Sequence, residues 1–298
     1  MKMTKKIMAL LCCLMLVFTM VACGSDKDSS DNLLKKNPSV LTTEATASEA
    51  ITTETSAQAP TEEDTTAATE PGDTPNVNVE TETYPVVIEP GHSPVGNSYF
   101  DDAAFVGDSV SLKLSYYAMS TGKLGSAQFF TSGSLGANNA LWSVSDESVH
   151  PSFRGEKMLI EDCIKNSGAK KVYIMLGMND LGLYGIETTL ESYDTLVNKI
   201  LEKSPDVKIV IQSMTPMTNT SNIYGSSLNN NVIRDYNSRL RSWSQSAGYG
   251  FVDVASVMYD SNGAHLNRDY CSDPDGMGVH FTEAGCDAWI EYLSTHTD

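Results

Sequence analysis

The sequence predicts an α/β fold, a three-layer α/β/α sandwich on a five-stranded parallel sheet in the flavodoxin-like arrangement. Five short apolar runs rich in β-branched residues recur along the second part of the chain, and segments with helical spacing of apolar residues lie between them. Strands that alternate with helices in this way form parallel sheets covered on both faces. The expected strands are Ala103–Gly107, Ala127–Thr131, Lys171–Leu176, Val207–Gln212 and Gly250–Val254.

Each expected helix carries an apolar stripe. The first begins at Ser109, and a later one places Cys163 on its apolar face. Thr188-Thr189-Leu190-Glu191 fits a capping box, which predicts a helix start there. A fourth stripe runs from Val232 to Trp243, and Thr282 is the expected N-cap of the last helix.

The N-terminus has the pattern of an export signal. Three lysines precede the apolar run from Ile7 to Ala22, which is short for a membrane span and ends directly before Cys23. This pattern predicts a bacterial lipoprotein signal peptide at residues 1–22 and a lipid on Cys23. The expected location is therefore extracytoplasmic, anchored to the cell membrane. The alternatives are an ordinary secretory signal cleaved near Ala22 and an uncleaved anchor.

The next segment does not have the composition of a folded domain. Residues 23–95 are rich in Thr, Ser, Glu and Pro and poor in aromatic residues, so they cannot bury enough apolar surface to fold. We expect a lipidated cysteine followed by a disordered linker, and a single α/β domain at residues 96–298.

Charge and cysteines exclude several classes of function. The formal net charge of −18 opposes binding to nucleic acid, which requires clustered Lys and Arg. Cys163 is expected in the core, while Cys271 and Cys286 either form one disulfide or remain free. No Cys/His cluster has the spacing of a zinc site, and neither a metal nor another cofactor is expected.

The turn Gly107-Asp108-Ser109 joins the first expected strand to the first helix. The hydroxyl of Ser109 would then lie beside the unpaired N–H groups of a helix N-terminus, which favour negative charge on a substrate atom. Two interpretations are open: Ser109 is a nucleophile, or it is only the N-cap of its helix.

Further polar features follow other strands of the same sheet. Gly133 and Gly136 lie in a turn where backbone N–H groups can approach a ligand, and Asn179 can donate an amide N–H to an oxyanion. His280, just before the last helix, is a candidate base. Singly, these residues also fit a turn, an Asx motif and a packed histidine, but together with a serine they fit a hydrolytic site.

From Phe100 to its end, the chain resembles the SGNH/GDSL hydrolase superfamily. Gly107-Asp108-Ser109 resembles the first block of that superfamily, which implies that Ser109 is the nucleophile. The second-block glycine most resembles Gly136, with Gly133 as the alternative.

The third and last blocks are also similar. Gly177-Met178-Asn179-Asp180 resembles the third block, which implies that Asn179 is an oxyanion donor, and His280 matches the histidine of the last block. The resemblance implies an SGNH hydrolase fold and an oxyanion hole formed by Ser109, Gly136 and Asn179.

One position departs from the superfamily pattern. The aspartate usually found three residues before the histidine is replaced by Met277. Asp275 is the first candidate for the carboxylate that orients His280, and Asp273 is the alternative. A Ser109–His280 dyad with a backbone carbonyl orienting the ring is a third possibility.

The resemblance implies a serine esterase, a carboxylic ester hydrolase that forms an acyl-enzyme on Ser109. A tethered domain on a long linker favours short acyl esters, above all O-acetyl, on cell-envelope or extracellular carbohydrate. The expected partners are an acylated small molecule or polysaccharide as substrate, and the membrane through the lipid anchor. The alternative is a non-catalytic surface lipoprotein that retains the fold to bind a carbohydrate or a protein partner.

Overall fold

The structure is a computed structural model that describes residues 89–297. The predicted signal peptide, the lipidation site Cys23 and the predicted linker up to residue 88 lie outside the described residues.

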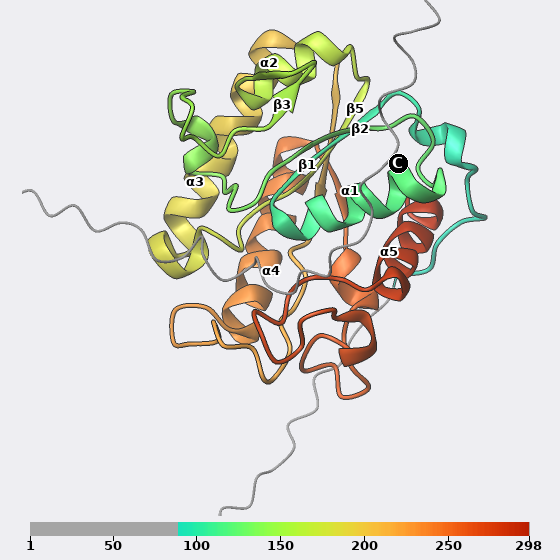
Figure 1. The fold of residues 1–298 in the computed structure, drawn as a ribbon, viewed down its shortest axis with the longest axis vertical. Coiled ribbons are helices and arrows are strands. Elements are labelled where there is room, and N and C mark those ends of the chain that lie inside the picture. The colour runs from blue at the N-terminus through green and yellow to red at the C-terminus, as the bar shows by residue number, and fades with distance from the viewer. Residues whose placement is uncertain (1–88, 298) are drawn as a thin grey trace, which may run out of the picture. The chain divides into compact units, whose positions relative to one another are not determined.

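A five-stranded parallel sheet forms the centre of the domain (Figure 1). Its strand order is β2-β1-β5-β6-β7, which confirms the predicted flavodoxin-like sheet. The residues of β1 are all buried because helices cover both faces. The strands are β1 (Ala103–Gly107), β2 (Gln128–Thr131), β5 (Lys171–Met175), β6 (Lys208–Gln212) and β7 (Gly250–Val252).

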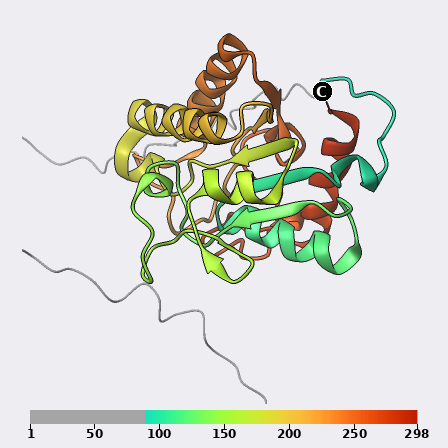
Figure 2. The same ribbon diagram turned by 90° about the horizontal axis from the view of Figure 1, so that it is seen from above.

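Helices form the two outer layers. The helix α1 packs against α5, while α3 contacts both α2 and α4. Figure 2 shows α3 and α4 on one side of the sheet and α1 and α5 on the other. The helices are α1 (Ser109–Thr121), α2 (Ile160–Ser167), α3 (Leu181–Lys203), α4 (Asn230–Ala247) and α5 (Glu283–Thr295). The three-layer prediction is therefore confirmed.

The capping box predicted at Thr188 is wrong. The helix α3 already begins at Leu181 and is interrupted at Gly185, whose φ of 73° lies in the left-handed region. The Thr189 hydroxyl donates to the Gly185 carbonyl, so it serves the interior of the helix rather than its start. In contrast, the predicted cap at Thr282 is confirmed, because its hydroxyl accepts from the N–H of Gly285.

Several short elements were not predicted. Two-residue strands β3 (Ser152–Phe153) and β4 (Glu156–Lys157) form a small antiparallel hairpin between β2 and α2. The 3₁₀ helices are η1 (Asn97–Phe100), η2 (Asn139–Leu141), η3 (Val254–Val257) and η4 (Arg268–Tyr270).

The folded unit begins earlier than the predicted boundary at residue 96. The N–H groups of His92 and Val95 donate to the carbonyls of Thr295 and Ser294, both at 2.9 Å. Residues 89–95 therefore pack along the end of α5 instead of belonging to a disordered linker, because backbone hydrogen bonds hold them there.

All three cysteines of the described region are free and buried. This confirms Cys163 as a core residue and leaves Cys271 and Cys286 unbridged. Burial raises the pKa of each thiol to about 12, which makes them poor nucleophiles. Among residues 89–297, no helix combines the length and the apolar character needed to cross a bilayer.

Candidate active site

The structure brings Ser109, His280 and Asp273 into one hydrogen-bonded chain. The Nε2 atom of His280 lies 3.0 Å from the Oγ atom of Ser109, and its Nδ1 atom lies 2.7 Å from Oδ2 of Asp273. Nucleophile, base and orienting carboxylate therefore have the connectivity of a catalytic triad. The His280 and Asp273 side chains are only partly buried, so a substrate can reach the site.

The strand-to-helix turn leaves the Ser109 hydroxyl free for His280. Asp108, not Ser109, is the N-cap of α1, because its Oδ1 atom accepts from the N–H of Val110 at 2.9 Å. A Cβ atom on Gly107 would lie 2.1 Å from the Ser111 hydroxyl, so the turn requires glycine there. The interpretation of Ser109 as a mere helix cap is therefore wrong.

The loop from Asp273 to His280 folds around the Asp273 side chain. Its Oδ1 atom accepts from the backbone N–H groups of Val279 and His280, at 3.2 and 3.1 Å. Its own carbonyl accepts from the N–H groups of Gly276 and Gly278. This compact loop returns the chain so that an aspartate seven residues before the histidine contacts the ring.

Residues after β6 hold this loop from outside. The Thr218 hydroxyl donates to the carbonyl of Pro274 at 2.7 Å, and the N–H of Asn222 donates to that of Gly276 at 2.8 Å. Gly278 has a φ of 68°, and a Cβ atom there would lie 2.2 Å from the Thr218 hydroxyl. Only glycine fits this position without strain.

The first-choice assignment of Asp275 is wrong. The Asp275 side chain is 72% exposed and pairs with Arg268, whose Nη2 atom lies 3.1 Å from both carboxylate oxygens. Asp275 therefore faces Arg268 and not the histidine, and the alternative candidate Asp273 takes the orienting position. The dyad with a backbone carbonyl is not the observed arrangement.

Two of the three predicted oxyanion residues, Gly136 and Asn179, lie on loops that touch. The Nδ2 atom of Asn179 donates to the carbonyl of Leu135 at 3.0 Å, and the second N–H of this amide remains available. Asp180 clamps the same loop, because its carboxylate accepts from the N–H groups of Ala137 and Asn138 at 2.9 and 3.0 Å. Asn179 therefore sits beside the glycine-rich turn, as expected of an oxyanion donor.

Gly136 does not offer the predicted donor. Its N–H is bonded to Oδ1 of Asn139 at 2.8 Å. The need for glycine has another cause, since a Cβ atom would lie 2.6 Å from the Asp180 carboxylate. The alternative, Gly133, is exposed and follows Ser132, whose N–H bonds the carbonyl of Gly107. Gly133 therefore lies in the loop after β2, next to the turn that carries Ser109.

Two buried carboxylates beside the site were not predicted as functional residues. Burial raises the pKa of Asp108 to about 6 and also raises that of Asp180. The signal in the sequence was their position. Asp108 directly follows β1 and precedes Ser109, and Asp180 directly follows Asn179 in the loop after β5.

Within residues 89–297, no group of three or more His, Cys, Asp or Glu side chains could hold a metal ion.

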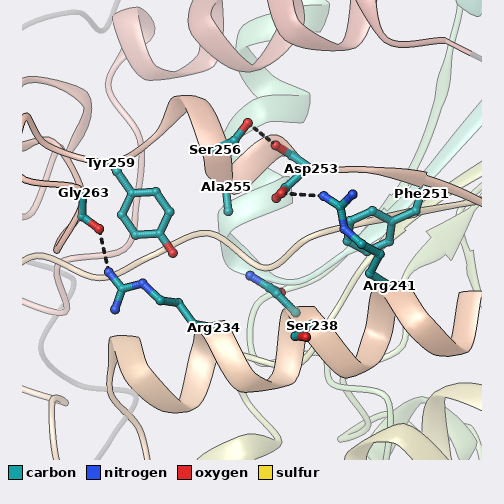
Figure 3. A pocket seen from close by; sticks show the side chains of 10 residues that line it. Arg234, Ser238, Arg241, Phe251, Asp253, Ala255, Ser256, Tyr259 and Gly263 are labelled. Carbon is teal, nitrogen blue, oxygen red and sulfur yellow. Dashed lines mark hydrogen bonds and ion pairs between the residues drawn. The ribbon is translucent and has the colours of Figure 1, made fainter. Parts of the chain in front are cut away.

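A polar cavity of about 270 Å³ lies between α4 and the segment after β7, and none of the predicted site residues lines it. Its guanidinium groups are already engaged (Figure 3): Arg241 pairs with Asp253 at 2.8 Å, and Arg234 donates to the carbonyl of Gly263 at 2.7 Å. Arg241 also pairs with Glu89. These contacts hold Glu89 and the segment after β7 against α4.

Residues 155–288 match the model of the GDSL-like Lipase/Acylhydrolase family. The match includes Asn179, Asp273 and His280, while Ser109 precedes it. None of the curated proteins matches this chain.

Solved structures include distant likenesses. A GDSL-like lipase from Bacteroides thetaiotaomicron aligns over 64% of this chain and 84% of its own, with 16% identity and a TM-score of 0.49. The C-terminal catalytic domain of peptidoglycan O-acetyltransferase A from Streptococcus pneumoniae aligns over 65% and 90%, with 15% identity and a TM-score of 0.42. A carbohydrate esterase family 3 protein from Talaromyces cellulolyticus aligns over 64% and 93%, with 18% identity and a TM-score of 0.40.

At this distance the three structures do not define the activity of this chain. The likeness to a family rests on the family model alone: residues 155–288, which include the loops that carry Asn179, Asp273 and His280, match the GDSL-like lipase/acylhydrolase family.

Proposed function

We propose that this protein is a serine esterase that hydrolyses short acyl esters, above all O-acetyl groups, on carbohydrate outside the cytoplasm. The observation that carries the proposal is the chain of contacts from Asp273 through His280 to Ser109, at 2.7 and 3.0 Å. The non-catalytic alternative depended on a misplaced aspartate. Asp273 in contact with His280 removes that reason.

In the proposed reaction, the Ser109 oxygen attacks the ester carbonyl while Nε2 of His280 takes the hydroxyl proton. The tetrahedral oxyanion accepts hydrogen bonds from the N–H of Ser109, the N–H of Gly133 and the second amide N–H of Asn179. Its collapse breaks the ester C–O bond, and the leaving alcohol receives the proton from His280.

Water then attacks the acyl-enzyme, again losing its proton to His280. Carboxylic acid leaves and Ser109 recovers its hydrogen. Throughout, the Asp273 carboxylate fixes the histidine ring and stabilises its charged form.

The substrate and location are part of the proposal. The pattern of Lys2, Lys5, Lys6 and Ile7–Ala22 before Cys23 supports an exported lipoprotein, and a linker of the composition of residues 24–88 would give the domain reach. Carbohydrate of the cell envelope or beyond it lies within that reach.

The test is acetate release from 4-nitrophenyl acetate and from O-acetylated xylan, with wild-type protein and Ser109→Ala. We expect wild-type turnover on both esters. The variant should lose at least about 10³-fold in kcat while its circular dichroism spectrum stays unchanged, because the nucleophile is the one group that the mechanism cannot replace. Equal turnover by the variant would contradict the proposal.

A further inference from the structure

Large exposed hydrophobic side chains concentrate at the catalytic edge of the sheet. Among the described residues there are seven, and five of them lie in a loop, or in the first turn of a helix, that follows the carboxyl end of a strand. Three are aromatic and polar-tipped: Trp142 at 55% exposure, Tyr184 at 40% and Tyr224 at 41%. We call these three residues the aromatic rim. Isolated surface hydrophobics are ordinary, but a gathering at one functional edge calls for a cause.

The loop that carries Tyr224 packs on the histidine loop. The Ser221 hydroxyl donates to the carbonyl of Met277, and the backbone of Asn222 bonds that of Gly276. The Tyr224 ring lies beside the His265 ring, with centroids 6.5 Å apart. Tyr224 therefore stands on a loop that packs against the loop that orients His280.

Tyr184 and Trp142 belong to the oxyanion side of the site. Tyr184 lies in the first turn of α3, and its N–H donates to the carbonyl of Asp180 at 2.8 Å. Trp142 ends the short helix η2, which contacts α3 and begins with Asn139, the partner of the Gly136 N–H. The three rings thus stand next to the segments that carry the glycine-rich turn, Asn179 and His280.

We propose that the aromatic rim binds the sugar chain of a polymeric O-acylated glycan, so that the acyl group on one sugar reaches Ser109 while neighbouring sugars pack on the rings. This inference rests on the proposed function and extends it from an acyl ester on carbohydrate to a polymeric sugar chain that binds on both sides of the reacting sugar. Tyr and Trp rings offer rigid faces for the C–H surface of a pyranose and polar tips for its hydroxyls, at little entropy cost.

Charge favours a glycan over a lipid surface. Membranes that attract peripheral proteins are anionic and select clustered Lys and Arg, whereas this chain carries a formal net charge of −18. A neutral glycan meets no such repulsion. Because the rings stand on three separate segments of the chain, an occupant that contacts all of them must extend beyond the ester that reacts.

The experiment compares the triple variant Trp142→Ala/Tyr184→Ala/Tyr224→Ala with the control Tyr116→Ala. Tyr116 is 60% exposed but lies on α1, about two helical turns from Ser109. For O-acetylated xylan we expect the KM of the triple variant to rise about tenfold or more, since each lost stacking contact weakens binding several-fold. The kcat/KM of the triple variant for 4-nitrophenyl acetate should stay within about twofold of the wild-type value. For the control Tyr116→Ala, the KM for xylan and the kcat/KM for 4-nitrophenyl acetate should both stay within the same limit.

Two results would overturn the inference: an unchanged KM for xylan in the triple variant, or an equal loss on the small ester, which would place the rings in the chemistry or the folding. If Tyr116→Ala raised the KM for xylan as much as the triple variant does, the effect would not be specific to the aromatic rim, and the inference would also fail.

A failure of the proposed function is separable. If the wild type releases no acetate from either ester, retardation in gels that contain acetylated xylan still reports binding, and it must weaken in the triple variant. Rim-dependent binding to phosphatidylglycerol vesicles without such retardation would contradict the glycan assignment.

Discussion

Two aspartates flank the catalytic pair, and the protein holds them in opposite ways. Asp108 is buried at the start of α1, and burial raises its pKa to about 6. Asp273 is partly exposed. Although its partial burial acts in the other direction, hydrogen bonds from the ring and backbone of His280 hold the pKa of Asp273 below its ordinary value. The histidine loop therefore carries a firmly ionised carboxylate, while the nucleophile turn carries one whose charge is costly.

The difference reflects how each region is built. The nucleophile turn depends on neighbours in sequence: a buried strand, Gly107, and the cap that Asp108 provides for its own helix. The histidine loop depends on distant residues, since Thr218 and Asn222 hold its backbone. Local rules describe the first region, and tertiary contacts decide the second.

Removing the charge of Asp273 should lower kcat more than removing the charge of Asp108 does. In Asp273→Asn, the ring of His280 loses its orienting carboxylate, and an amide N–H can face Nδ1 and favour the wrong tautomer. We expect kcat for 4-nitrophenyl acetate to fall about 10³- to 10⁴-fold. The matched control Asp275→Asn, which breaks only the exposed pair with Arg268, should stay within about threefold.

Steady-state kinetics of the two variants at pH 7 show which of the two aspartates orients His280. Equal losses, or a greater loss in Asp275→Asn, would mean that the loop rearranges and that the observed assignment of Asp273 is incorrect.

Neutralising Asp108 should lower kcat less than neutralising Asp273 does. It should also stabilise the fold. Since folding raises the pKa of this carboxyl from about 3.9 to about 6, the folded state binds the proton more tightly. The charge therefore destabilises the fold progressively between pH 4 and 6 and fully above that window. Asn caps helices as well as Asp does, so Asp108→Asn should gain about 1–3 kcal/mol at pH 8 and nothing near pH 4.

Urea unfolding of wild type and Asp108→Asn at the two pH values measures this difference. We also expect kcat to fall by less than about tenfold, because the Asp108 charge attracts the protonated histidine. A stability difference that does not change with pH would show that the carboxylate ionises freely in the folded state.

The fold could be predicted because the signals for it are local. Five apolar runs and the apolar stripes between them predicted the five strands of the central sheet, and Thr282 marked the start of α5. The start of α3 was missed, since Leu181–Tyr184 forms one helical turn ahead of Gly185 and reads as a loop in sequence. The contacts of residues 89–95 with α5 carry no periodic pattern at all.

The site was predictable where residue type alone suggests the chemistry, as for Ser109 and His280, whose side chains are in contact. It was not where geometry decides between similar residues. Asp273 and Asp275 are equally acidic, and only the path of the loop and the position of Arg268 separate them. Gly136 and Gly133 differ in the same way, because the Asn139 side chain occupies one N–H.

We propose that Ser109 is a nucleophile activated by His280 and Asp273. The most direct measurement is labelling of the folded protein with a fluorophosphonate probe, followed by mass spectrometric mapping of the adduct. The contacts of 3.0 and 2.7 Å predict one adduct, on Ser109, formed in the wild type, much slower in Asp273→Asn and absent in Ser109→Ala. No adduct on folded wild-type protein, or an adduct on another serine, would contradict it.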